Sequence, residues 1–305
     1  MRSTERRGLL AGLGFTGLWI IGLGLFTAFP VGASLYYSFC DYSILKAPVW
    51  IGLENYTQLL HDDLFWKSLG NTLFYAALSV PLGTVVALAL AVLLNQDVRG
   101  KAFFRVCFYL PSIVPVVASV MLWTWMLNGQ FGLLNYVLTP LLGPFGVEPP
   151  LWLSDPAWAK PALVIMSLWG TGNAMVIYLA GLQSVPRHLY EAADIHGASA
   201  WQRFRHVTLP MIAPVIYFNI IMAIIGSLQV FTQAFIIAAA AGNGDGASGS
   251  PARSTLFYTI YLFSTSFYDL KMGYGSAMAY VLFVIIAGLT WAATRLTRRL
   301  VEDVS

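Results

Sequence analysis

The sequence predicts an all-α integral membrane protein that crosses the bilayer six times, with both termini in the cytoplasm. Three observations predict this class: an apolar composition, six long windows without charged residues, and an uneven distribution of lysine and arginine. Of the 305 residues, 58% are hydrophobic and 10% are charged, whereas an ordinary soluble domain carries about 25% charged residues. The composition therefore excludes an ordinary soluble protein.

Each of the six apolar windows is long enough to hold the roughly 20 residues that cross a hydrocarbon core of about 30 Å as a helix. A helix satisfies every backbone donor and acceptor within its own segment, and hydrocarbon surroundings require this. The predicted spans are residues 9–37, 69–94, 107–127, 162–182, 211–238 and 276–294.

The orientation follows from the distribution of Lys and Arg, because cytoplasmic loops carry the excess of these residues. The N-terminus, the loop near residue 100, the loop near residue 200 and the C-terminus together hold 12 of the 17 Lys and Arg residues. Both termini are therefore predicted to be cytoplasmic, as an even number of spans requires. This topology also accounts for the net charge of +3, so the charge implies no nucleic-acid partner.

We expect a single transmembrane domain over residues 1–305, with its core at about 67–295, because no linker divides the chain. The first apolar stretch is longer than the roughly 7–15 apolar residues of a cleaved signal peptide, so we expect it to be retained as a helix. Cys40 and Cys107 fall at opposite membrane faces in this topology, which excludes a disulfide between them. The four histidines lack the spacing of metal ligands, and we expect no metal site and no cofactor.

The segment 184–210 interrupts the apolar pattern, and it reads EAADIHGASAWQRFRHVTLP from Glu191 onward. We expect Ser184 to cap a short helix that begins near Pro186. Gly197 permits a backbone conformation that most residues resist, so a turn is expected there. Ser199 and Gln202 have the spacing of a capping box that opens a second short helix. The sequence therefore predicts a helix, a glycine turn and a helix on the cytoplasmic surface.

This segment resembles the cytoplasmic EAA loop of bacterial ABC-importer permeases, through which an ATPase subunit moves the membrane channel. The resemblance rests on the EAA triplet, a glycine six residues after the glutamate, and a terminal Leu-Pro in a loop between the fourth and fifth of six spans. It implies a MetI-like type I importer fold without enzymatic activity. Taken alone, the same segment also fits an amphipathic interfacial hairpin that has no partner. The coupling residues implied by the resemblance are Glu191, Ala192, Ala193, Gly197, Leu209 and Pro210.

Other segments resemble carbohydrate-importer permeases of the maltose, lactose and glycerol-phosphate type, and within these the F-type, MalF-like subunit. They are GLENYTQLL from Gly52, NTLFY from Asn71, VPLGTVVALALAVLLN from Val80 and FYLPSIVPVVASVMLWTWML from Phe108. The chain departs from the EAA pattern at His196, where Asp is common, and at Val207, where Ile is common.

The resemblance implies a bacterial inner-membrane location and the uptake of a sugar or sugar derivative. It also implies four kinds of partner: a homologous G-type permease, two ATP-binding ABC subunits, an extracytoplasmic sugar-binding protein and the membrane lipid. ATP hydrolysis belongs to the partner subunits, and this chain agrees because it lacks the G-x-x-x-x-G-K-[ST] phosphate loop. At its only Gly-Lys pair, Gly100-Lys101, Asn95 stands at the first glycine position and Ala102 follows the lysine.

Polar side chains inside the fourth and fifth predicted spans are candidates for a substrate path, because such groups are costly unless they face protein or water. Related permeases that hold a sugar mid-membrane use these two spans, and neutral amides beside an aromatic ring suit a sugar. The alternative is that these groups only hydrogen-bond neighbouring helices, and both interpretations stay open for most single residues. We favour the path for Asn173. The candidates are Trp169, Gly170, Asn173, Ser227, Gln229, Phe231 and Gln233.

The alternative function is a six-span secondary carrier or a membrane enzyme in which the EAA match arose by chance. A carrier predicts intramembrane charges or repeated broken helices, and an enzyme predicts acid, base or metal ligands clustered at one face. The sequence has no charged residue at the centre of a predicted span and no such cluster. These observations favour the importer permease.

Overall fold

A computed structural model describes residues 2–96, 99–241 and 246–302. The described chain forms two compact units, one of residues 1–62 and 262–283 and the other of residues 63–261 and 284–305, and each is treated by itself. The expectation of a single domain over residues 1–305 stays a prediction.

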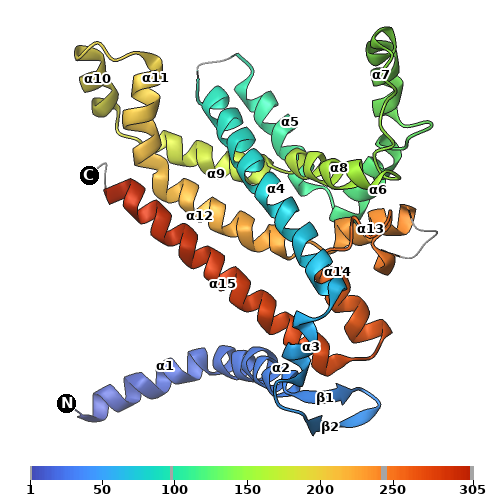
Figure 1. The fold of residues 1–305 in the computed structure, drawn as a ribbon. Helices are drawn as coiled ribbons and strands as arrows, with labels where there is room; N and C mark the ends of the chain where they lie inside the picture. The colour runs from blue at the N-terminus through green and yellow to red at the C-terminus, as the bar shows by residue number, and fades with distance from the viewer. Residues whose placement is uncertain (1, 97–98, 242–245, 303–305) are drawn as a thin grey trace. The chain divides into compact units, whose positions relative to one another are not determined.

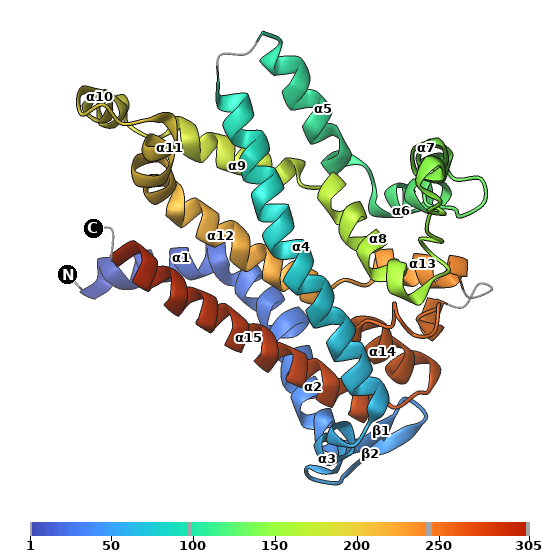
Figure 2. The ribbon, with the colours of Figure 1, turned by 45° about the horizontal axis from the view of Figure 1, so that its top comes forward.

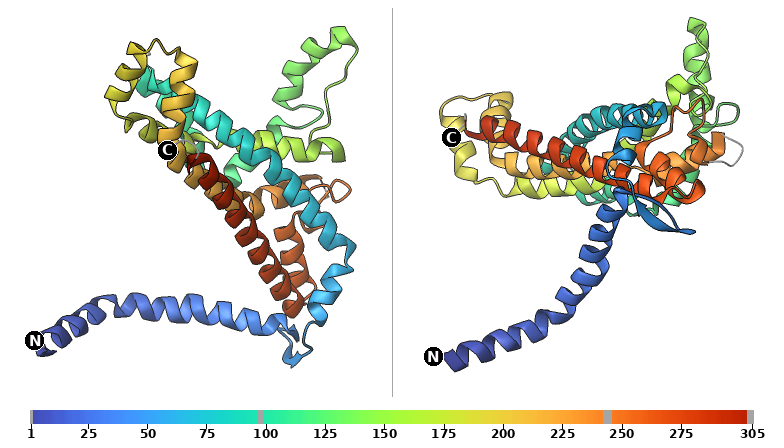
Figure 3. Two further views of the ribbon diagram at one scale, coloured as in Figure 1. Left: turned by 60° about the vertical axis from the view of Figure 1, so that its left-hand side comes forward. Right: turned by 60° about the horizontal axis from the view of Figure 1, so that its bottom comes forward.

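The first unit begins with a long helical rod built of α1 (Arg2–Leu23), the π-helical segment η1 (Gly24–Ala28) and α2 (Phe29–Ser38). Figure 3 shows these three elements as one gently curved helix. Its apolar side chains are exposed, among them Phe15 at 91% and Leu18 at 84%. Such a surface suits hydrocarbon, where apolar side chains need no burial against protein.

A small β-hairpin follows, although the sequence predicted only helices and loops. Strand β1 (Cys40–Ser43) pairs antiparallel with β2 (Lys46–Trp50), and the short helix α3 (Glu54–Leu60) comes next. The Asn55 amide donates to the Ser38 and Cys40 carbonyls at 2.9 Å each. The Phe39 and Trp50 rings stack with centroids 5.4 Å apart. These local contacts hold the hairpin, and the hydrophobic periodicity of the sequence does not reveal them.

The second unit is helical, apart from its connections. Its elements are α4 (Asp63–Asn95), α5 (Lys101–Ile113), α6 (Val116–Met126), α7 (Leu133–Leu142), η2 (Gly143–Phe145), α8 (Pro156–Trp169), α9 (Gly172–Gln183), α10 (Arg187–Ile195), α11 (Ala200–Arg203), η3 (Phe204–Thr208), α12 (Leu209–Leu228), α13 (Thr232–Ala241) and η4 (Gly246–Ser248). Helix α14 (Tyr258–Phe263), the segment η5 (Ser264–Tyr268) and helix α15 (Met272–Glu302) complete the chain. Figure 1 shows their order.

Helix α4 is the centre of this unit, because α8, α9 and α12 all pack against it (Figure 2). Ala87 and Ala91 of α4 are fully buried in one apolar cluster with Met175 and Leu179 of α9. Small residues one helical turn apart let two helix backbones approach closely, which is the usual way that helices associate in a membrane.

Four helical stretches of the described chain are long and apolar enough to cross a membrane: Gly12–Ser38, Asp63–Asn95, Ala200–Ala240 and Met272–Arg295. They correspond to the first, second, fifth and sixth predicted spans. The third and fourth correspond to bent pairs, α5 with α6 at 100° and α8 with α9 at 47°. Counting each pair once gives up to six spans, and the number six and the orientation stay predictions.

The bend between α5 and α6 falls at Pro115, which occupies the N-cap position of α6 with an extended ψ of 134°. A proline cannot donate the backbone hydrogen bond that would continue the helix. Of the two prolines in this stretch, the bend lies at the second, since Pro111 stays within α5.

Gly172, the first residue of α9, allows this helix to lie against the backbone of α5. A Cβ at this position would stand 2.3 Å from the Phe108 carbonyl oxygen and 2.9 Å from the Tyr109 Cα. Backbone atoms do not yield as the end of a flexible side chain does, so no larger residue fits without moving one helix.

We predict that Gly172→Ala destabilises the protein, because overpacking of this kind typically costs about 1–3 kcal/mol. Thermal unfolding of the detergent-solubilised protein, followed by size-exclusion fluorescence, measures the effect. Gly70→Ala is the control, since a Cβ at Gly70 of α4 meets nothing within 4 Å. Equal stability of the two variants would contradict the close approach of α5 and α9.

Candidate functional site: the EAA loop and a cavity at three helix breaks

The EAA loop begins where α9 ends, and the expected role of Ser184 at this point was wrong. Its hydroxyl donates to the Gly181 carbonyl at 2.7 Å and its amide donates to the Ala180 carbonyl. Ser184 therefore closes α9 instead of capping the next helix. Pro186 occupies the N-cap position of α10 without a side-chain hydrogen bond.

Gly197 ends α10 in the left-handed conformation, with φ of +70°, as the sequence predicted. The Ala198 amide donates to the Ala193 carbonyl and the Gly197 amide donates to the Asp194 carbonyl, both at 3.0 Å. These two bonds form a Schellman motif, which satisfies the last carbonyls of a helix and favours glycine at its left-handed position. The turn that reverses the chain is therefore fixed by the backbone.

The predicted capping box at the start of α11 is confirmed. The Ser199 amide donates to Gln202 Oε1 at 2.7 Å, and the Gln202 amide donates to Ser199 Oγ at 3.3 Å. The Tyr190 hydroxyl lies 3.0 Å from Thr208 Oγ1 and ties α10 to the π-helical segment η3. Leu209 and Pro210 then begin α12, so the loop is joined directly to a long helix.

The outer surface of the loop carries exposed side chains of mixed character. Glu191 and Ala192 are exposed and Ala193 is half-buried, while Ile195 and Trp201 are 85% and 67% exposed. An acidic group among small and large apolar residues is a surface suited to a protein partner, because large exposed apolar side chains are uncommon in a surface that meets only water.

A cavity of about 450 Å³ lies where three helix breaks meet. The first break contributes Val116 at the start of α6, the second contributes Gly170 and Thr171 between α8 and α9, and the third is the segment 229–232 between α12 and α13. We call this space the break cavity. Non-helical backbone at membrane depth is tolerated only where protein covers it or where it lines a water-filled space, so its convergence here marks a candidate site.

The lining of the break cavity mixes apolar and polar side chains, and none of the described residues that line it is charged. It includes hydroxyls, amides and aromatic rings, and the helices α4, α8, α9, α12 and α13 all contribute. The lining residues with polar or aromatic side chains are Tyr75, Ser79, Thr84, Ser167, Thr171, Tyr178, Asn219, Ser227, Gln229, Phe231, Thr232 and Gln233. Such groups form hydrogen bonds to a neutral ligand and offer ring faces for its apolar side.

One buried hydroxyl of the lining remains available for a ligand. Ser79 Oγ is buried and makes no hydrogen bond of ordinary geometry within the described residues. By contrast, Asn219 Nδ2 donates to the Val215 carbonyl at 2.9 Å and Ser227 Oγ donates to the Ile224 carbonyl at 3.0 Å. A buried hydroxyl without a partner is costly, so water or a ligand is expected against Ser79.

The structure brings together five of the seven path residues that the sequence suggested. Gly170, Ser227, Gln229, Phe231 and Gln233 line the break cavity.

The other two lie outside this lining. Asn173 is exposed, and the Trp169 ring packs edge-on against Trp123 with centroids 6.0 Å apart. Sequence reasoning missed Tyr75, Ser79 and Thr84 of α4. The polar Ser79 and Thr84 inside an apolar span were the signal that would have found them.

We predict that Gly197→Ala loosens the turn, because an L-residue in the left-handed region costs roughly 1–2 kcal/mol. Amide hydrogen exchange of α11 should quicken by about tenfold for such a loss. The control Asp194→Asn removes only an ion pair with Arg203, whose side chains are 55% and 35% exposed, and exposed pairs contribute about 0–1 kcal/mol. Unchanged exchange in Gly197→Ala would be inconsistent with a rigid turn.

Comparison with known proteins agrees with this geometry. Residues 79–302 match the family described as binding-protein-dependent transport system inner membrane component. The chain is 40% identical over 287 residues to the probable ABC transporter permease protein YesP of Bacillus subtilis strain 168, covering 93% of this chain and 89% of YesP. It is 36% identical over 243 residues to the lactose transport system permease protein LacF of Rhizobium radiobacter, covering 79% and 78% of the two chains.

The fold is similar to a chain in the crystal structure of a bacterial ABC transporter involved in the import of the acidic polysaccharide alginate. The TM-score is 0.79 and the identity 22%, over 98% of each chain, and this likeness confirms the expected permease fold. The secondary carrier and the membrane enzyme are not favoured, although the broken helices that we expected of a carrier are present. The chain belongs to the binding-protein-dependent transport system inner membrane components, and it is a permease subunit rather than an enzyme.

Proposed function

We propose that this protein is the F-type permease subunit of an ABC importer that takes up a neutral sugar or sugar derivative. The observation that carries the proposal is the break cavity, whose lining offers hydroxyls, amides and aromatic rings without a charged side chain. A neutral polyhydroxylated ligand matches this chemistry. The similarity to a lactose transport permease also supports a sugar. The substrate contacts include Gln229, Phe231 and Gln233 together with Ser79.

The importer has four further protein subunits in this proposal. A homologous G-type permease completes the pore, and two ATP-binding subunits drive it. An extracytoplasmic sugar-binding protein delivers the substrate, and membrane lipid surrounds the spans. The chain crosses the membrane six times as one domain with both termini in the cytoplasm. The excess of Lys and Arg near both termini and in the EAA loop supports this orientation.

The EAA loop is the surface that receives an ATPase subunit. Glu191 stands exposed at the outer surface of α10 beside the small residues Ala192 and Ala193, so a basic side chain of the partner can approach it. Gly197 sets the angle between α10 and α11, and Leu209 and Pro210 begin the helix that carries movement toward the cavity.

We predict that Gln233→Ala weakens the apparent affinity for the transported sugar by about five- to tenfold, because one hydrogen bond contributes about 1 kcal/mol. Uptake into proteoliposomes of the complete transporter, with a panel of neutral disaccharides that includes lactose, measures the change. Asn173→Ala is the comparison variant, since Asn173 lies beside the same break but outside the cavity lining. Unchanged affinity in Gln233→Ala, with normal assembly, would place the sugar elsewhere.

We predict that Glu191→Ala leaves membrane insertion intact and uncouples ATP hydrolysis from uptake. Truncating one partner of a buried interfacial charge pair typically costs about 2–5 kcal/mol. The measurement compares substrate-stimulated ATPase activity with uptake in the same preparation. The exposed Asp194→Asn serves as the matched control on the same helix. Wild-type uptake and stimulation in Glu191→Ala would remove the coupling role.

A further inference from the structure

The segment 229–232 forms the third wall of the break cavity, and it is held from outside the cavity. Helix α12 ends at Leu228 and α13 begins at Thr232, so the segment between them leaves backbone groups that no helix satisfies. The Val230 carbonyl in this segment accepts a hydrogen bond from Thr259 Oγ1 of α14. Val230 lines the cavity, whereas Thr259 does not.

Thr259 ends a stretch that we call the return segment, residues 253–259, of which residues 254–258 are buried. Two hydrogen bonds from the Asn71 amide of α4 fix its first part, at 3.0 Å to the Arg253 carbonyl and 3.0 Å to the Leu256 carbonyl. The Tyr258 amide donates to Thr72 Oγ1 at 2.9 Å. Adjacent residues of α4 therefore hold the return segment at both ends.

The Asn71 amide is the clamp that holds the return segment to α4, and a residue of α8 orients it. Lys160 Nζ donates to Asn71 Oδ1 at 3.2 Å and lies 4.8 Å from the centre of the Phe74 ring. Because Oδ1 accepts from Lys160, the amide nitrogen of Asn71 is directed to the return segment. Asn71 is 3% exposed, so water does not compete for these bonds.

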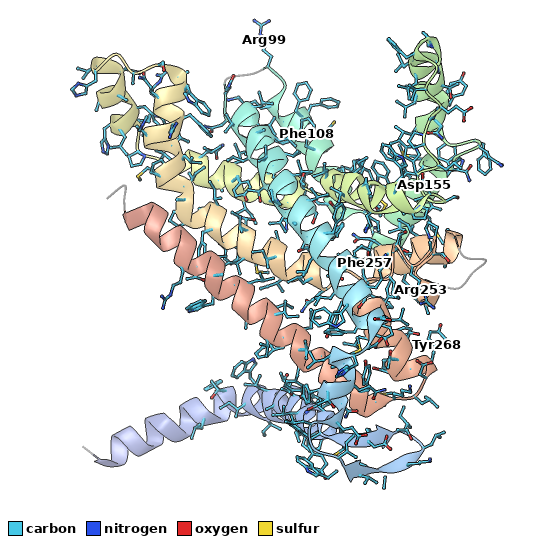
Figure 4. The ribbon with its side chains drawn as sticks, viewed as in Figure 1. Arg99, Phe108, Asp155, Arg253, Phe257 and Tyr268 are labelled. Carbon is cyan, nitrogen blue, oxygen red and sulfur yellow. The ribbon has the colours of Figure 1, made fainter. Side chains whose placement is uncertain are left out.

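An aromatic contact joins the same segment to the cavity. Phe257 is fully buried, and its ring meets the Tyr75 ring edge-on with centroids 5.5 Å apart. Tyr75 lines the break cavity. Figure 4 labels Phe257 and Arg253 on the return segment. The segment thus contacts one wall through Phe257 and a second wall through Thr259.

We propose that the return segment is a strut that sets the position of the third cavity wall, and that Thr259 is the positioning residue through which it acts. Without the hydroxyl, the Val230 carbonyl has no partner from α14, and the short connection from Gln229 to Phe231 can move. The role of the strut in sugar binding rests on the proposed function. The position of the third wall does not depend on that function, and it is measured without any sugar.

The experiment measures thiol reactivity in the complete transporter, in a Cys107→Ser background that removes the exposed native cysteine. Gln233→Cys reports the third wall, and Asn219→Cys reports the part of the lining on α12, before the break. The probe is the water-soluble methanethiosulfonate reagent MTSET. Thr259→Val should raise the labelling rate of Gln233→Cys by about tenfold, as expected when a partly buried carbonyl loses its partner, and leave Asn219→Cys unchanged.

Thr259→Ser keeps the hydroxyl and should label as the parent does. Asn71→Leu removes the hydrogen bonds of Asn71 to the return segment and leaves Thr259 in place. It should raise labelling at Gln233→Cys in the same way, and it replaces Thr259→Val in the test if that variant fails to assemble. Equal rates in all variants would overturn the proposal. So would a parallel rise at Asn219→Cys, which indicates general loosening, or a failure of Thr259→Ser to restore the parent rate. A loss of sugar affinity in Gln233→Ala without any effect of Thr259→Val would reject the strut alone.

Discussion

A broken helix in hydrocarbon leaves backbone groups without partners, and each such group costs several kcal/mol. The second unit breaks three apolar helices and directs all three breaks to one cavity. Local hydroxyls meet part of the demand, since Thr171 Oγ1 donates to the Leu168 carbonyl and Thr259 Oγ1 to the Val230 carbonyl. The cavity therefore lies where these breaks meet, and the side chains around it supply its hydrogen-bonding groups.

The backbone groups at the helix ends of the EAA loop also need hydrogen-bond partners, and here helix caps supply them. Its two helix ends are exposed, yet the Schellman motif at Gly197 and the capping box at Ser199 satisfy their backbone groups internally. Each cap contributes about 1 kcal/mol, whereas the exposed pair of Asp194 and Arg203 contributes little. The loop is thus held by its own two caps, and Glu191 stays exposed on its surface.

Apolar composition predicted the spans, and the glycine turn with the capping box predicted the EAA hairpin, because both depend on short-range patterns. The hairpin β1–β2 depends on contacts of Asn55 and Trp50 that have no period. The break between α8 and α9 contains no proline, and its local signal is the weaker one of Gly170 and Gly172. Helical spacing explains the position of Asn173: the lining residues Thr171, Ala174 and Tyr178 follow one face at the start of α9, and residue 173 does not belong to it. The position of Asn173 within a predicted span therefore did not show whether its side chain lines the cavity.

The two candidate sites are joined by two helices. Helix α9 begins beside the break at Thr171 and ends at the EAA loop, and α12 begins at the other end of the loop and ends beside the break at Gln229. Gly181 brings α9 close to Val215 of α12, because even a Cβ there would stand 3.3 Å from the valine. Twelve residues of α9 span roughly 18 Å at 1.5 Å per residue. The loop and two of the three cavity walls are therefore connected through two packed helices, and both of these helices also pack against α4.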